Sequence, residues 1–176
     1  QEIVNKNYAL GLEINEKIEK TGSIFTPDEI NLLWEHRDDE VARQLLIMIY
    51  TGMRVGEMLA LHKSTIHLEK SYMIGGNKSE AGIDRVIPLH RKIVPLIASS
   101  LGENEYLLEN PETGKPFSYN AIREKYKAFF QEHGMEHKAH DCRKTAVSLM
   151  HSGGIPMESI RMIVGHAGKG VTESVY

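Results

Sequence analysis

The sequence predicts an α+β fold, in which a mainly helical domain carries a small three-stranded antiparallel sheet. Two observations lead to this prediction. Apolar residues recur at helical spacing in several segments, for example between Val41 and Ile49. Between residues 65 and 89 this period gives way to short stretches of β-branched or alternating residues, separated by glycines such as Gly75 and Gly82.

Residues 1–23 are polar and weakly patterned, so we interpret them as a linker or the remnant of a preceding region. Order is expected from residue 24 onward. Thr26 suits the N-cap of a first helix, Pro27 suits its first turn, and Glu29 stands where a capping box requires it. A single domain is therefore expected over residues 24–176.

The other elements follow in order, and glycines mark several of their ends. Gly52 ends the second helix, and Gly165 ends the last one. The predicted helices cover approximately residues 26–36, 40–52, 54–61, 94–101 (interrupted near Pro95), 118–130, 140–152 and 156–164; the predicted strands cover Thr65–Leu68, Tyr72–Ile74 and Ile83–Leu89, and residues 103–115 form a loop.

The composition is that of a soluble globular protein. Of the 176 residues, 41% are hydrophobic and 26% are charged, and a chain of this length can bury a core. The longest apolar run, Leu45 to Tyr50, is too short to cross a bilayer, and the first residues lack a signal-peptide pattern. A single cysteine excludes an internal disulfide. We therefore expect a cytoplasmic protein without a membrane partner.

Several polar residues suit chemistry on a phosphate. His140 and Arg143 are three positions apart, which places them on one face of a helix. Arg54 follows a glycine turn, and Glu57 can reach back to hold a neighbouring guanidinium or amide. Beyond the last predicted helix, His166 precedes a short glycine-containing link that leads to Tyr176. A tyrosine after such a link can be moved into and out of a site.

The motifs Thr51-Gly-Met-Arg54-Val-Gly-Glu57, His140-Asp-Cys-Arg143, Gly165-His166 and Tyr176, in this order, resemble the tyrosine recombinases. They are most similar to the integrases of phages and conjugative elements. The resemblance extends from about Phe25 to Tyr176. One such motif alone is weak, whereas four in order are specific.

The resemblance implies metal-independent DNA cleavage and rejoining through a 3′-phosphotyrosyl intermediate, with no cofactor and no metal. Two guanidiniums bind the non-bridging oxygens of the scissile phosphate, replacing a metal. A histidine accepts the proton of the tyrosine nucleophile, and a hairpin lysine protonates the 5′-oxygen. The matching residues are Arg54, Lys78, His140, Arg143, His166 and Tyr176, with Glu57 and Asp141 in supporting roles.

The implied function is site-specific recombination, with integration or excision of a mobile element. The implied partners are double-stranded DNA at specific attachment sites and other recombinase protomers, as a tetramer on DNA. The family also has an N-terminal core-binding domain, which we do not find in this sequence. A net charge of −3 is low for a DNA-binding protein, but nine Lys and Arg stand against six Asp and Glu from Lys115 onward. A local basic surface and modest affinity are expected.

Other functions remain open from the sequence. A type IB topoisomerase uses similar chemistry without a partner site, and a non-catalytic DNA-binding relative results if Tyr176 cannot reach the arginines. Taken singly, Arg54 and Arg143 also suit structural ion pairs, with Glu57 or Asp141 as partner.

A metal- or thiol-dependent hydrolase is a more distant alternative. His133-Gly-Met-Glu136-His137 fits the zinc-protease pattern HxxEH. That pattern requires a continuous helix, and Gly134 lies within it, so we expect solvated loop histidines instead. Cys142 is expected to be a small buried hydrophobe.

Overall fold

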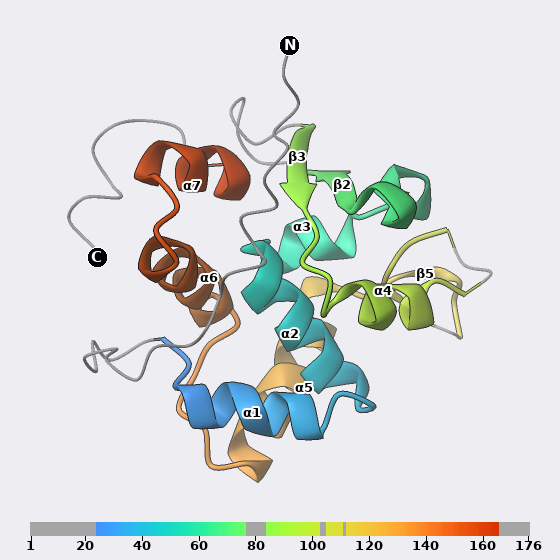
Figure 1. Cartoon of the computed structure of the whole chain (residues 1–176). Coiled ribbons are helices and arrows are strands. Elements are labelled where there is room, and N and C mark those ends of the chain that lie inside the picture. Colours follow the sequence, from blue (N-terminus) through green and yellow to red (C-terminus); the bar gives the residue numbers. More distant parts are fainter. Residues whose placement is uncertain (1–23, 77–83, 103–104, 111, 166–176) are drawn as a thin grey trace.

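The computed structural model describes residues 24–76, 84–102, 105–110 and 112–165 (Figure 1). This part of the chain has seven α-helices and one three-stranded antiparallel sheet, which confirms the predicted fold class. The α-helices are α1 (Pro27–Glu35), α2 (Glu40–Thr51), α3 (Val55–Leu59), α4 (Val94–Ser100), α5 (Tyr119–Glu132), α6 (Asp141–Ser152) and α7 (Met157–Val164). The strands of the sheet are β1 (Ile66–His67), β2 (Tyr72–Gly75) and β3 (Arg85–Pro88), and short 3-10 helices precede and follow β1 (Lys63–Thr65 and Leu68–Lys70).

Helix α2 lies at the centre of the molecule, and α1, α4, α5 and α6 pack around it (Figure 1). All residues from Gln44 to Ile49 are buried, so this helix faces the protein interior on every side. Its buried apolar side chains join those of α1, α5 and the sheet in one core. Among the described residues, no helix combines the length and apolarity needed to cross a membrane.

The ends of the first helices follow from local sequence. Thr26 and Glu29 form the predicted capping box: the Thr26 side chain accepts from the Glu29 amide, and the Glu29 carboxylate accepts from the Thr26 amide at 2.7 Å. The prediction that Pro95 interrupts a helix is wrong. Pro95 lies in the first turn of α4, where the missing proline N–H costs no helical hydrogen bond.

The sheet has the order β1-β2-β3, and Met73 of β2 lies opposite Ile87 of β3. All three strands are found where the sequence predicted them, although β1 and β3 are shorter than expected. Along β3, Arg85 and Ile87 are buried while Val86 is exposed. In the region predicted as a loop, β4 (Glu109–Asn110) pairs with β5 (Lys115–Pro116). The sequence did not predict this pair, because two-residue strands carry no periodic signal.

Helices α6 and α7 form a second, smaller apolar cluster beside the main core. Here the C-terminal end of α2 meets the C-terminal end of α7. Gly52 ends α2 with φ of 67°, and a Cβ added to it would lie 2.8 Å from Val164 Cγ1. Glycine is therefore required at position 52 both for its backbone angle and for this close approach.

Gly52→Ala is expected to lower the free energy of unfolding by about 2–4 kcal/mol, because the new Cβ disfavours a positive φ and collides with Val164. Urea unfolding followed by circular dichroism measures the loss. Gly114→Ala is the matched control: its φ is 62°, and among the described residues none has an atom within 4 Å of an added Cβ apart from its chain neighbours. This control is expected to cost about 1 kcal/mol. Equal losses for the two variants would contradict the close contact between α2 and α7.

Candidate active site

Arg143 of α6 lies between the ends of two other helices. Its Nη1 donates to the carbonyl oxygen of Gly52 at 2.8 Å, and its Nη2 donates to the carbonyl oxygen of Val164. These are terminal carbonyls of α2 and α7, which have no acceptor role inside their own helices. The C-terminal end of a helix carries partial negative charge, so a cation is favoured there. Arg143 therefore joins α2, α6 and α7.

This position bears on the role predicted for Arg143. The residue is only 2% exposed, and two of its guanidinium nitrogens face backbone carbonyls. Its contact with a phosphate stays a prediction. Asp141, the other predicted supporting residue, accepts a hydrogen bond from the Lys138 amide at 2.9 Å and lies 3.2 Å from Lys144 Nζ.

Arg54 immediately precedes α3 and is held by Glu57, as the sequence predicted. The Arg54 amide donates to Glu57 Oε2 at 2.9 Å, and Arg54 Nη1 donates to Glu57 Oε1 at 2.8 Å. The Glu57 side chain is fully buried, whereas 30% of the Arg54 side chain is exposed. Arg54 thus combines a fixed backbone with a guanidinium that solvent can reach.

Arg85 of β3 is a further member of this cluster that sequence reasoning missed. It forms a fork with Glu57, with Nη1 to Oε1 at 3.2 Å and Nη2 to Oε2 at 2.8 Å. Burial raises the pKa of Glu57, but the hydrogen bonds from Arg85 and Arg54 outweigh it, so the net pKa is lowered. The alternation of β3 was the available signal: it places Arg85 on the same face as buried Ile87, where an arginine needs a partner.

His140 directly precedes the first residue of α6, and its side chain is exposed to solvent. Partial desolvation of the ring lowers its pKa. The positive charges of Arg143, Lys144 and Arg54 lower the pKa further, and Asp141 acts in the opposite direction. The imidazole is therefore mainly neutral at pH 7 and can accept a proton.

The described structure thus brings together Arg54, Glu57, His140 and Arg143, at the junction of α2, α3 and α6. The remaining predicted residues, Lys78, His166 and Tyr176, lie outside the described residues. Their roles, like those of the described residues, stay predictions.

The HxxEH pattern does not lie on a continuous helix, because α5 ends at Glu132 and Gly134 has φ of 64°. The expectation of solvated histidines is nevertheless wrong for His137. Its ring stacks on Phe25 at 4.0 Å between centroids, and its Nε2 lies 3.1 Å from Glu29 Oε2. Within the described ranges, no cluster of three or more His, Cys, Asp or Glu side chains is arranged to bind a metal.

Cys142 is buried, as expected, with no exposed surface. Desolvation raises the pKa of its thiol far above the ordinary value. The thiol therefore stays protonated at neutral pH, which disfavours a nucleophilic role.

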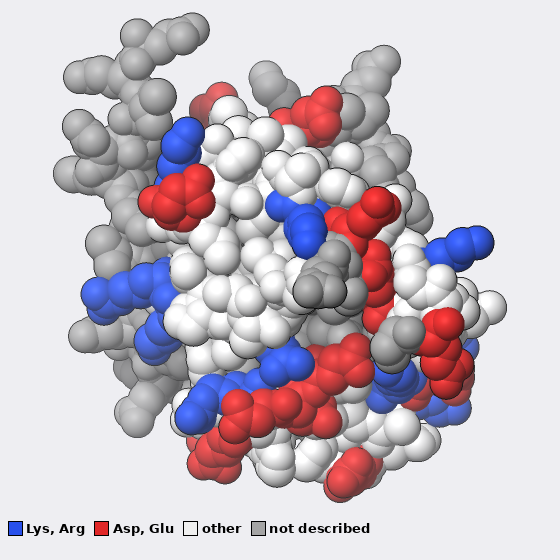
Figure 2. Space-filling model, turned by 90° about the vertical axis from the view of Figure 1, so that its right-hand side faces the viewer, with Lys and Arg blue, Asp and Glu red and all other residues white. Residues whose placement is uncertain are grey.

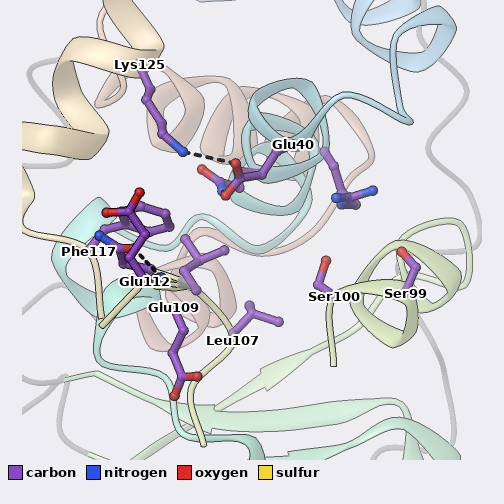
Figure 3. A pocket seen from close by; sticks show the side chains of 12 residues that line it. Glu40, Ser99, Ser100, Leu107, Glu109, Glu112, Phe117 and Lys125 are labelled. Carbon is purple, nitrogen blue, oxygen red and sulfur yellow. Dashed lines mark hydrogen bonds and ion pairs between the residues drawn. The ribbon is translucent and has the colours of Figure 1, made fainter. Parts of the chain in front are cut away.

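A pocket of about 550 Å³ lies at the other end of α2, away from this junction (Figure 3). Two of the charged groups that line it form an ion pair, with Lys125 Nζ 3.1 Å from Glu40 Oε2, and Lys125 Nζ also lies 4.3 Å from the centre of the Phe117 ring. None of the predicted site residues that the structure describes lines it. The candidate active site is therefore a surface junction of helix ends and not this pocket.

Comparison with known proteins agrees with the predicted fold and with the family that the sequence resembles. A family model described as the phage integrase family matches residues 23–176. The tyrosine recombinase XerA of Pyrococcus horikoshii is 25% identical over 176 residues, covering 90% of this chain and 58% of that protein. The chain thus spans little more than half the length of this relative.

Solved structures show the same fold. A crystal structure of XerA recombinase has a TM-score of 0.72 and 24% identity, covering 86% of this chain and 59% of that one. A structure of the Tn1549 transposon integrase in complex with circular intermediate DNA has a TM-score of 0.73 and 15% identity, covering 93% of this chain and 63% of that one.

His140 is expected to titrate below its ordinary pKa of 6.5 in an NMR titration, with its signal assigned by comparison with His140→Gln. Because the folded pKa lies below the unfolded one, protonation favours unfolding, and stability should decline as the pH falls through 6.5. Arg54→Met removes one nearby positive charge and should raise the pKa of His140. Arg43→Met, which removes a positive charge at the pocket at the other end of α2, is the control. An unchanged His140 pKa in Arg54→Met would contradict the proximity of these groups.

Proposed function

Because the chain belongs to the phage integrase family, we propose that it is the catalytic domain of a site-specific DNA recombinase, acting in integration or excision. One observation supports this most directly. A half-buried arginine (Arg54), a buried arginine (Arg143) and a histidine (His140) meet at one junction, and the charges of both arginines lower the pKa of His140. Such a group suits binding of an anionic phosphodiester together with acceptance of a proton.

The proposed reaction is an exchange of one phosphodiester bond for another. The Tyr176 oxygen bonds to the scissile phosphorus while the bond from phosphorus to the 5′-oxygen breaks. The phenol proton passes to His140, and Lys78 donates a proton to the departing 5′-oxygen. Attack of a 5′-hydroxyl on the 3′-phosphotyrosine reverses each transfer. Because the bond energy is retained, no ATP is needed.

The arginines supply the charge that the reaction needs without a metal or cofactor. The phosphate gains negative charge as it becomes pentavalent, and guanidiniums stabilise it through paired hydrogen bonds. We assign this role to Arg54 and Arg143, with Glu57 and Asp141 in support, and we assign positioning of the phosphate to His166. Because Arg143 is 2% exposed and donates to the carbonyls of Gly52 and Val164, its role requires the guanidinium to turn towards the phosphate when DNA binds.

Duplex DNA at specific attachment sites is the proposed partner, together with other protomers that form a tetramer on the DNA. The Tn1549 integrase, which has this fold, was solved with circular intermediate DNA, and this supports the choice of DNA. On the side of the molecule that carries α4, Lys and Arg side chains lie beside Asp and Glu (Figure 2). A mixed face of this kind does not favour DNA.

The C-terminal half offers a more basic surface near His140. Lys127, Lys138 and Lys144 line a hollow of about 360 Å³, although Glu136 and Asp141 line it too. We propose that residues 24–176 form the catalytic domain and that residues 1–23 connect it to a core-binding domain. We propose that the protein acts in the cytoplasm, which is where the DNA lies in a cell without a nucleus.

Tyr176→Phe is expected to abolish covalent adduct formation, because no other group is proposed to attack the phosphate. The full-length protein is incubated, in EDTA, with a pool of nicked duplexes of random sequence that lose a short strand on cleavage. Adducts are isolated on denaturing gels and sequenced to identify the site.

Tyr176→Phe should still bind the recovered duplex and shift its mobility in a native gel. Tyr119→Phe, a change at an exposed tyrosine of α5, is the control and should give the parent yield. A normal adduct yield from Tyr176→Phe would overturn the assignment of the nucleophile. Absence of any adduct from the parent protein would overturn the proposed function.

Lys78→Ala is expected to cleave normal DNA at least about 100-fold more slowly, because the 5′-oxygen leaves poorly without a proton. Replacing that oxygen with sulfur makes a better leaving group, so the variant should then cleave nearly as fast as the parent. Arg54→Ala should show no such rescue, since it acts on non-bridging oxygens. If sulfur fails to rescue Lys78→Ala, the general acid must be sought elsewhere, with Lys70 and Lys144 as the next residues to test.

A further inference from the structure

The carboxylate of Glu57 is buried and receives four hydrogen bonds from two arginines. Arg54 contributes its amide and Nη1, and Arg85 contributes Nη1 and Nη2, over distances of 2.8–3.2 Å. A buried carboxylate is costly unless it is paired and its lone pairs are satisfied. Glu57 meets this condition only with both arginines present.

The two arginines differ in what else they can reach. The Arg85 side chain is 4% exposed, and its remaining Nε donates to the carbonyl oxygen of Ile163 at 2.9 Å. All three of its nitrogens therefore have protein partners, and a DNA phosphate has no access to it. Arg54, with a side chain that is 30% exposed, is the member of the cluster that can meet a phosphate.

The charges of the cluster explain why a second arginine matters. Arg54 and Glu57 alone would form a neutral pair, and a neutral pair attracts an anionic phosphate weakly. Arg85 adds one positive charge, so the group of three carries +1. Its fork also fixes both oxygens of Glu57, and these oxygens in turn hold the amide and the guanidinium of Arg54.

Arg85 also joins the cluster to the end of α7. It binds the carbonyl of Ile163, and Arg143 binds the carbonyl of the next residue, Val164. Two buried arginines thus anchor successive carbonyls at the C-terminal end of this helix, where positive charge is favoured. His166 follows two residues later in the sequence.

We propose that Arg85 is a positioning residue of the cleavage site: it neutralises Glu57 and ties it to the end of α7, so that Arg54 stays oriented towards a DNA phosphate and the cluster keeps a net positive charge. The inference rests on the proposed function. It assigns to Arg85 an effect on the charge felt by the phosphate, beyond a contribution to folding.

The test compares Arg85→Met with the parent on two versions of the nicked duplex recovered from the random pool. One has a normal scissile phosphate; the other has a methylphosphonate there, in which a methyl group replaces a charged oxygen. Release of the short strand is timed with protein in excess. Arg85→Met is expected to be about 100-fold slower on the phosphate, but less than about tenfold slower on the uncharged methylphosphonate.

A variant that only loosened the fold would slow both substrates alike, and that outcome, or no slowing at all, would overturn the proposal. Arg43→Met is the matched control, because this arginine lines the pocket at the other end of α2. It should cleave both substrates at the parent rate.

The double variant Glu57→Gln/Arg85→Met covers the case in which Arg85→Met does not fold. It removes both buried charges, so no carboxylate is left unpaired, and the charge of the cluster is again +1. Loss of a Glu57 oxygen is expected to slow both substrates, but the ratio of the rates on the phosphate and the methylphosphonate should return to within about tenfold of the parent's ratio. A folded double variant that is slowed selectively on the phosphate, as Arg85→Met is, would overturn the charge argument. If the parent itself forms no adduct, the proposed function fails and this inference fails with it.

Discussion

The interaction on which the site depends most is the placement of Arg143 between the C-terminal ends of α2 and α7. Its guanidinium satisfies carbonyls of Gly52 and Val164 that helical hydrogen bonding leaves open. The contact requires the two helix ends to be close, and this closeness requires a glycine at position 52. One buried side chain therefore fixes the relation between the central helix and the last described helix.

The second constraint is the buried carboxylate of Glu57. It connects α3 to β3 through Arg85, and Arg85 connects both to α7. The arrangement gives the small sheet a role in the site through Arg85, a buried residue of β3. Arg85 and Arg143 donate to the adjacent carbonyls of Ile163 and Val164, so two side chains from different elements hold the C-terminal end of α7.

Electrostatics follow from this framework. Arginine charges gathered at the junction oppose protonation of His140, so the same residues that suit phosphate binding also keep the imidazole able to accept a proton. A surface junction suits a long duplex ligand better than an enclosed cavity does. In the pocket at the other end of α2, Lys125 is already paired with Glu40. The junction around His140 and the pocket around Lys125 thus differ in their charged groups as well as in their position.

The sequence alone determined the local features: the capping box of Thr26 and Glu29, the helix end at Gly52, the strands, and the pair formed by Arg54 and Glu57. These depend on residues within a few positions of one another, where backbone geometry restricts the outcome. Only the tertiary structure decided the partners across the chain. Arg85 reaches Glu57 over 28 positions, Arg143 reaches Gly52 over 91, and His137 reaches Glu29 over 108. No periodicity encodes such distances, because they arise from how α2, α6, α7 and the sheet pack together, and burial then makes the pairing of each charged side chain obligatory.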